Sequence, residues 1–246
     1  MIIPSTRLFT AGEVQTGAYL NNSITAMANF ATNSPLCLAL QGGSIQGFFA
    51  NIDTAVNFNF ETIDNDGMHS LSSLTATATA ISGTGSIVTV TAPNSFKPFD
   101  NITLSGFTTA AYNTATPVVC LTATSTSFTV SSTATGASSA GTASTQLNSR
   151  FTCNTAGWYY ISGTIHLAGS AGNIRGVGLI LNGSRIVAAN NRQPWISVAV
   201  DTFLDITPVL QYLNVGDIVQ AYVRSPVVTQ TDTTINSTIE FKWISL

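Results

Sequence analysis

Charged residues are scarce in this sequence. They make up 8% of its 246 residues, whereas an average soluble domain carries about 25%. Lysine occurs only at Lys97 and Lys242, and the formal net charge is −3. Nucleic-acid binding needs clustered Lys and Arg to neutralise phosphates, so the composition argues against nucleic acid as a partner. The same shortage of cations argues against a basic face that lies on a membrane.

Long apolar runs, a secretory leader and paired cysteines are also missing. No run approaches the roughly 18 apolar residues that a membrane span requires. Residues 1–10 lack a charged region followed by an apolar core, so no secretory signal is expected. The cysteines, Cys37, Cys120 and Cys153, are odd in number and widely spaced. This pattern does not fit a disulfide framework or a zinc site. We therefore expect buried free thiols in a protein that folds in a reducing cytosol.

Groups with the spacing that catalysis needs are few. His69 and His166 are the only histidines, and we expect each to be packed or solvated rather than catalytic. Asp201 and Asp205 are four residues apart. That separation on a strand or loop is too large for the two carboxylates of a retaining glycosidase, which lie about 5 Å apart. We expect no enzymatic activity and no cofactor.

Asp64 and Asp66, followed by Gly67, are the nearest approach to a metal-binding motif. They are similar to the start of a calcium loop, but the later ligands and the closing Glu are missing. A plain Asx turn is therefore favoured over a calcium site, and no metal ligands are assigned.

Hydrophobic residues are plentiful at 44%, and Thr, Ser, Asn and Ala replace the missing charge. Disordered chains combine low hydrophobicity with high net charge, so this composition predicts a folded protein. Near the N-terminus, Leu20, Ile24, Met27 and Ala31 fall on one face of a helix. We expect a short docking helix there. Its apolar face must be buried against another surface, which could be the β domain of its own chain, a sister subunit or a partner protein.

Short apolar runs with period-two alternation predict β-strands from residue 36 onward. A long strand is expected at 157–167, and Asn182-Gly183 predicts a hairpin with a type I′ turn. In 55–60, the residues Val56, Phe58 and Phe60 are expected on one face. Further strands are expected at 36–40, 203–206, 218–223 and 237–246. Many short strands at regular spacing indicate an all-β sandwich or jelly roll.

The block 74–146 differs in composition, because its only charged residues are Lys97 and Asp100 and Thr, Ser, Ala and Gly dominate. Strand patterns persist within it, which a disordered linker does not carry. They lie at 87–91, 102–104, 118–121 and 127–130. We expect a small separate β module of four to six strands, with 133–145 irregular.

Three stretches resemble the jelly roll of the complement-C1q/tumour-necrosis-factor-like family. They are 150–162, which is similar to F-T-x-P-x-x-G-x-Y-x-F, then 213–219, which is similar to L-x-x-G-D-x-V, and the aromatic closing strand around Phe241 and Trp243. The resemblance covers roughly 35–73 and 147–246. It implies a homotrimer whose subunits pack through aromatic faces. The domains are then an N-terminal arm (1–34), a jelly-roll trimerisation domain (35–73 with 147–246) and an inserted module (74–146).

Further stretches resemble structural proteins of tailed bacteriophages. They are 9–21, 59–69 and 81–130; the last resembles a small β module common in virions, although Phe99-Asp100 stands where that module has Gly-Asp. The resemblance implies a virion protein assembled in the host cytoplasm. The first hypothesis is a trimer that decorates and stabilises the capsid, bound to the major capsid protein or another virion protein. The alternatives are a tail-fibre or baseplate protein that binds a host glycan or receptor, and a tail-associated polysaccharide depolymerase.

The aromatic residues Trp158, Tyr160, Phe241 and Trp243 are the candidate functional positions. Alternating strand faces send some of them to the core, and the others are candidates for a trimer interface, where aromatic residues are favoured. Carbohydrate stacking is a third use.

Overall fold

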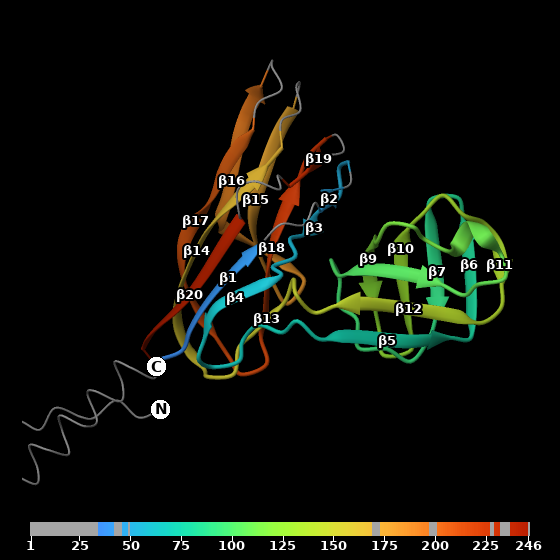
Figure 1. The fold of residues 1–246 in the computed structure, drawn as a ribbon, viewed down its shortest axis with the longest axis horizontal. Coiled ribbons are helices and arrows are strands. Elements are labelled where there is room, and N and C mark those ends of the chain that lie inside the picture. Colours follow the sequence, from blue (N-terminus) through green and yellow to red (C-terminus); the bar gives the residue numbers. More distant parts are fainter. Residues whose placement is uncertain are drawn as a thin grey trace, which may run out of the picture.

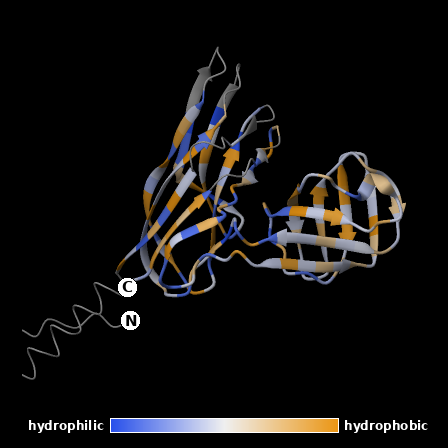
Figure 2. Ribbon diagram, in the orientation of Figure 1, coloured by the Kyte–Doolittle hydropathy of each residue, from blue (hydrophilic) through white to orange (hydrophobic). Residues whose placement is uncertain are grey.

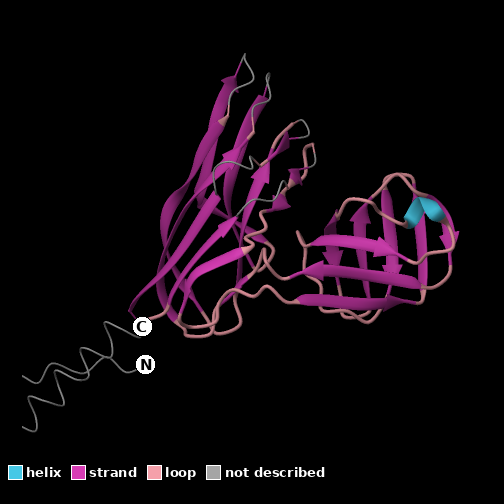
Figure 3. Ribbon diagram, in the orientation of Figure 1, coloured by secondary structure: helices cyan, strands magenta, loops and turns pink. Residues whose placement is uncertain are grey.

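The computed structural model describes residues 34–41, 46–48, 50–168, 173–196, 201–226, 229–231 and 237–245. Within these ranges the chain is almost entirely β, and the only helix is the 3₁₀ turn η1 (Ala110–Tyr112). The all-β prediction is confirmed (Figure 3). The expected docking helix with Leu20, Ile24 and Met27 lies outside the described residues. Figure 1 shows two β bodies, one built from β1–β4 and β13–β20, the other from β5–β12.

The first body is a jelly-roll sandwich of two antiparallel sheets. One sheet has the order β17 (Thr202–Leu213), β14 (Gly157–Leu167), β20 (Ser237–Ser245), β1 (Leu36–Gln41) and β4 (Phe60–Asp64). The other has the order β13 (Phe151–Thr152), β18 (Ile218–Arg224), β15 (Asn173–Leu181) and β16 (Ser184–Ile196), and β3 (Thr54–Ala55) also pairs with β18. A short pair, β2 (Gly47–Phe48) with β19 (Thr229–Gln230), lies apart. Apart from the β15–β16 hairpin, successive strands of the two sheets alternate between them, as in other jelly rolls.

Side-chain alternation fixes which face of each strand enters this core. On β14 the buried residues include Tyr159, Ile161, Ile165 and Leu167, as predicted for one face. On β20 the buried apolar residues are Ile239, Phe241 and Trp243. The Phe151 ring stacks on Phe241, with centroids 4.6 Å apart. Aromatic rings bring large apolar areas to the core, and such pairs add about 1 kcal/mol each beyond area burial.

The predicted hairpin between β15 and β16 is confirmed. Asn182 has φ 49° and Gly183 has φ 83°, the left-handed conformation that a type I′ turn requires. The Asn182 side chain also holds the neighbouring turn, because its amide nitrogen donates to Asp217 Oδ1 at 2.7 Å and its oxygen accepts from Ile218 N at 2.9 Å.

The prediction of one continuous strand at 55–60 is wrong, because its middle residues form no strand. The chain leaves the second sheet after β3 and enters the first sheet at β4, so 56–59 form no strand. Val56 and Phe58 are buried, whereas Phe60 is 57% exposed. The alternation of buried and exposed side chains holds only until the chain crosses to the first sheet. There Phe60 pairs with Leu40 and lies on the outer side of that sheet.

The second body is one antiparallel sheet in the order β11-β6-β7-β10-β9-β8-β12-β5. It surrounds its own core, which includes Ile81, Val90, Leu104, Phe128 and Val130, and Figure 2 shows hydrophobic residues along its strands. The strands are β5 (Ser73–Ala78), β6 (Ala80–Thr84), β7 (Ile87–Thr91), β8 (Asn101–Ser105), β9 (Val118–Ala123), β10 (Ser127–Ser131), β11 (Thr135–Ser138) and β12 (Gly141–Gln146). Two expectations are wrong: the body has eight strands rather than four to six, and 133–145 contains β11 and most of β12.

Phe99 occupies a backbone position that suits glycine. Its φ is 74°, a left-handed conformation that costs a residue with a Cβ about 1–2 kcal/mol. We expect Phe99→Gly to raise the free energy of unfolding by about 1 kcal/mol, because only glycine adopts this φ without a Cβ clash. Urea unfolding measures the change. Phe99→Ala is the matched control, since it removes the ring but keeps the Cβ, and an equal gain for both variants would contradict the backbone explanation.

The three cysteines are buried and free. Burial raises the pKa of the Cys120 thiol to about 12 and lifts the pKa of Cys37 and Cys153 above the usual range. A raised pKa lowers the thiolate fraction at a given pH, and the thiolate is the reactive form. At pH 8 we expect no cysteine of the native protein to react with Ellman's reagent, and all three to react in urea. Rapid labelling of the native protein would contradict this.

Candidate oligomerisation face

The outer side of the five-stranded sheet carries large apolar residues that point away from the core. Cross-strand partners share a face. On one flank Leu38 pairs with Ile63 and Leu40 with Phe60. On the other flank Trp158 pairs with Tyr212 and Tyr160 with Leu210. We call this surface the outer face and define it by Leu36, Leu38, Leu40, Phe60, Ile63, Trp158, Tyr160, Leu210, Tyr212 and Ile244.

The four aromatic residues singled out from the sequence separate into two pairs. Phe241 and Trp243 lie in the core, with exposures of 0% and 3%. The Trp243 indole N–H donates to Ala156 O at 3.3 Å, so its polar edge is satisfied. Trp158 and Tyr160 lie on the outer face instead, with exposures of 39% and 40%. Of the four, only this second pair is available for contact with another subunit.

Neighbouring strands make the aromatic flank of the outer face rigid. The Trp158 and Tyr212 rings meet edge to face, with centroids 5.5 Å apart. Rigid aromatic side chains lose little conformational entropy when a partner covers them, and they are enriched in interface centres. Tyr212 and Leu210 lie on β17, two residues apart with the same outward orientation. Their alternation with Val209, Gln211 and Leu213 is visible in the sequence, although the aromatic pattern alone points to Trp158 and Tyr160.

Two charges of opposite sign lie on the central strand between the two flanks. Along β20, Thr238, Glu240 and Lys242 occupy the outward positions, and Tyr160 pairs with Lys242. On β17 the Asp205 carboxylate accepts a hydrogen bond from Thr164 at 2.7 Å. Exposed apolar patches of this kind mark sites of protein–protein contact.

The two stretches that resemble the C1q-like motifs meet in space. Phe151 pairs with Val219 and Thr152 with Ile218. Cys153 N donates to Asp217 O at 2.8 Å, and Gly216 N donates to Cys153 O at 2.8 Å. The motif residues therefore form the junction of β13 with β18, which closes one end of the sandwich.

The remaining candidate groups lie apart from the outer face or make contacts within the chain. His69 is buried, and its ring nitrogens lie 3.0 Å from Glu61 Oε1 and 3.0 Å from Asn148 O. His166 is also buried, against the Phe203 ring. The Asp64 carboxylate accepts the N–H groups of Met68 and His69, at 2.9 and 2.7 Å. These residues lie four and five positions further on, whereas an Asx turn uses the N–H two positions on, so Asp64 holds a wider loop than the expected turn.

No group of three or more His, Cys, Asp or Glu side chains among the described residues has the geometry to hold a metal ion. None of the helices described is long and apolar enough to cross a membrane.

No protein-family model and no curated protein sequence matches this chain. Among solved structures, the chain is similar to the insecticidal delta-endotoxin Cry8Ea1 of Bacillus thuringiensis, at 10% identity and a TM-score of 0.23. That match covers 91% of this chain and 63% of the toxin, so the chain spans less than two thirds of the toxin's length. A second similar structure is infectious bursal disease virus, Gt strain, at 12% identity and a TM-score of 0.21, covering 84% of this chain and 70% of that one. TM-scores of this size carry no argument about function.

Proposed function

We propose that this chain is a non-enzymatic structural protein of a tailed-bacteriophage virion, which decorates and stabilises the capsid as a homotrimer. The observation that carries the proposal is the outer face, whose two flanks place large apolar residues on the outward side of one sheet of the jelly roll. Covering such a face stabilises an assembly by about 25 cal/mol per Å² of apolar surface removed from water. The proposal also draws on the resemblance of 150–162 and 213–219 to the C1q-like family, whose fold implies trimers.

In this proposal each part of the chain has one task. The outer face of each jelly roll packs against its sister subunits. The N-terminal arm, residues 1–34, docks on the capsid, and the module of β5–β12 extends to the side. The contacts between the module and the jelly roll support a fixed projection, because Asn101 Nδ2 donates to Ala55 O at 3.1 Å and to Asn57 Oδ1 at 3.0 Å.

Electron cryo-microscopy of the source particle, with and without this protein, tests the proposal. We expect three-fold density at lattice sites of the capsid, and its loss from particles that lack the protein. Unchanged capsid density together with lost density at the tail tip would overturn capsid decoration in favour of the tail-fibre or baseplate alternative. Light scattering of the pure chain tests the trimer separately, and a stable monomer at micromolar concentration would contradict it.

A further inference from the structure

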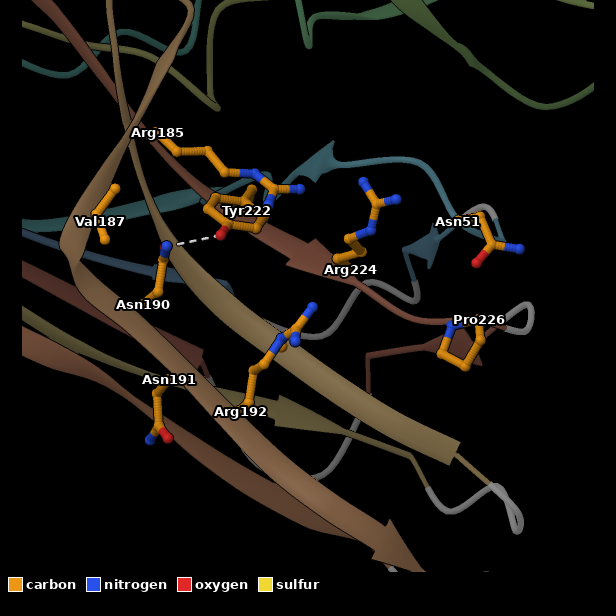
Figure 4. Close-up of a pocket in the computed structure, with 10 residues that line it drawn as sticks. Asn51, Arg185, Val187, Asn190, Asn191, Arg192, Tyr222, Arg224 and Pro226 are labelled. Atoms are coloured by element: carbon orange, nitrogen blue, oxygen red, sulfur yellow. Dashed lines mark hydrogen bonds between the residues drawn. The ribbon is translucent and has the colours of Figure 1, made fainter.

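A pocket of about 660 Å³ lies over the outer side of the second sheet, remote from the outer face defined above. This volume falls within the roughly 300–1,000 Å³ of small-molecule sites. Its walls come from β16 and β18 and from the segment before β3, as Figure 4 shows. Its polar side chains include Arg185, Arg192, Arg224, Tyr222 and Asn190.

Positive charge is concentrated here in a chain that is otherwise poor in charge. The sequence holds eight Lys and Arg residues in total, and three of them, Arg185, Arg192 and Arg224, line this pocket. Asp53 pairs with Arg185 and with Arg224 Nη1, the latter at 3.1 Å. One carboxylate thus faces three guanidinium groups, which leaves a formal surplus of two positive charges (3 − 1) among the described residues.

Arg192 is the cation without an internal role. It is exposed and forms no hydrogen bond or ion pair with any other described residue. Figure 4 shows its side chain extending from β16 toward the space beside Arg224. A guanidinium group offers five N–H donors in a planar fork that matches an oxyanion, so Arg192 is free to bind a ligand with two of them.

The surrounding groups are held in place before any ligand arrives. The Arg185 guanidinium lies over the Tyr222 ring, 5.0 Å from its centroid, and also pairs with Asp53. The Tyr222 hydroxyl donates to Asn190 Oδ1 at 2.7 Å, so the Asn190 amide group keeps its N–H donors. On the strand beneath, Gly178 leaves room for this bond, because a Cβ there would lie 2.3 Å from Asn190 Oδ1.

We propose that this pocket binds an oxyanion carried on a saccharide, either the carboxylate of a uronic acid or a sulfate group. The surplus positive charge and the unpaired guanidinium N–H donors of Arg192 favour an anionic ligand. The Asn190 amide and the neighbouring Asn51 suit the hydroxyl groups of a sugar. The pocket lies on the sheet face rather than along a strand edge, where a peptide would add as a further strand. The inference does not rest on trimer formation or on the place of the protein in a particle.

Isothermal titration of the full chain with three matched oligosaccharides tests the proposal. The ligands are a trimer of galacturonate, a sulfated trisaccharide and neutral maltotriose. We expect the uronate or the sulfated sugar to bind and maltotriose not to bind, and the two anionic arms identify which oxyanion the pocket takes. Loss of a charged hydrogen bond is worth about 1.5–3 kcal/mol, so Arg192→Ala should weaken binding by about tenfold or more.

Lys97→Ala is the matched control, because it removes one exposed positive charge outside this pocket. It should leave the affinity unchanged, and the circular dichroism of both variants should equal that of the wild type. The proposal is overturned if no anionic sugar binds, if Arg192→Ala binds as tightly as the wild type, or if a triglutamate peptide binds as tightly as the sugars. The last result would identify an acidic protein segment as the occupant.

Discussion

Replacing Asp100 by alanine is expected to lower the free energy of unfolding by about 3–5 kcal/mol, the usual cost of removing one partner from a buried ion pair. The Arg150 Nε donates to Asp100 Oδ1 at 2.8 Å, and Arg150 Nη2 pairs with Asp100 Oδ2. Both side chains are buried. Asp100 Oδ2 also accepts from Lys97 N at 2.7 Å, so the variant leaves a guanidinium group and a backbone N–H without their acceptor.

The position of this pair explains why its loss should be felt in both bodies. Asp100 precedes β8 of the module, and Arg150 precedes β13 of the jelly roll. The pair therefore joins the two cores near the point where the chain returns from the module. We expect the midpoint of urea unfolding to fall for both bodies, and the spectroscopic probes of each to report the change.

Asp205→Ala is the matched control for Asp100→Ala. Asp205 is exposed, and the side-chain hydrogen bond it accepts comes from Thr164. Its loss should cost less than about 1 kcal/mol, as for most surface positions. A second variant, Asp100→Leu with Arg150→Met, removes both charges and should recover most of the lost stability. A cost below 1 kcal/mol for Asp100→Ala would contradict a buried pair.

Strand positions were predictable wherever large apolar residues alternate with polar ones. The pattern 87–91 matches β7, and 127–130 lies within β10. Strand β12 gave no such signal, because Gly141–Gln146 contains only small and polar residues. It forms because β5 and β8 pair with it on both sides, and Ala143 is buried between them. That stabilisation comes from tertiary pairing, which no local window reveals.

For the same reason, the sequence does not predict which aromatic residues lie in the core and which lie on the surface. Strand β14 carries aromatic residues on both faces, since Trp158 and Tyr160 alternate with Tyr159. The sequence fixes which of them share a face, but the packing of the second sheet decides which face is covered. The same holds for the arginine-lined pocket, because Arg185, Arg192 and Arg224 come from two strands and meet only when β15 is placed between β16 and β18.

The largest effect on assembly is expected from the double variant Trp158→Asp with Leu210→Asp. Leu210 is 58% exposed, and Trp158 lies on the neighbouring strand of the outer face. Each substitution removes apolar burial worth about 1.5–3 kcal/mol at the proposed interface and places a carboxylate where it lacks a partner. Because a trimer holds three copies of each, the losses accumulate, and we expect full dissociation at micromolar concentration. Light scattering should record a fall from three times to one times the 25.7 kDa chain mass.

Val215→Asp is the matched control, because it places the same charge at an exposed apolar residue in the turn between β17 and β18. It should leave the mass unchanged, and circular dichroism should show native β-structure in both variants, since all three positions are exposed in the single chain. Dissociation caused by Val215→Asp would point to a general effect of charge. A double variant that keeps the trimer mass would show that the subunits meet elsewhere, and the outer face would then be free to contact the capsid itself.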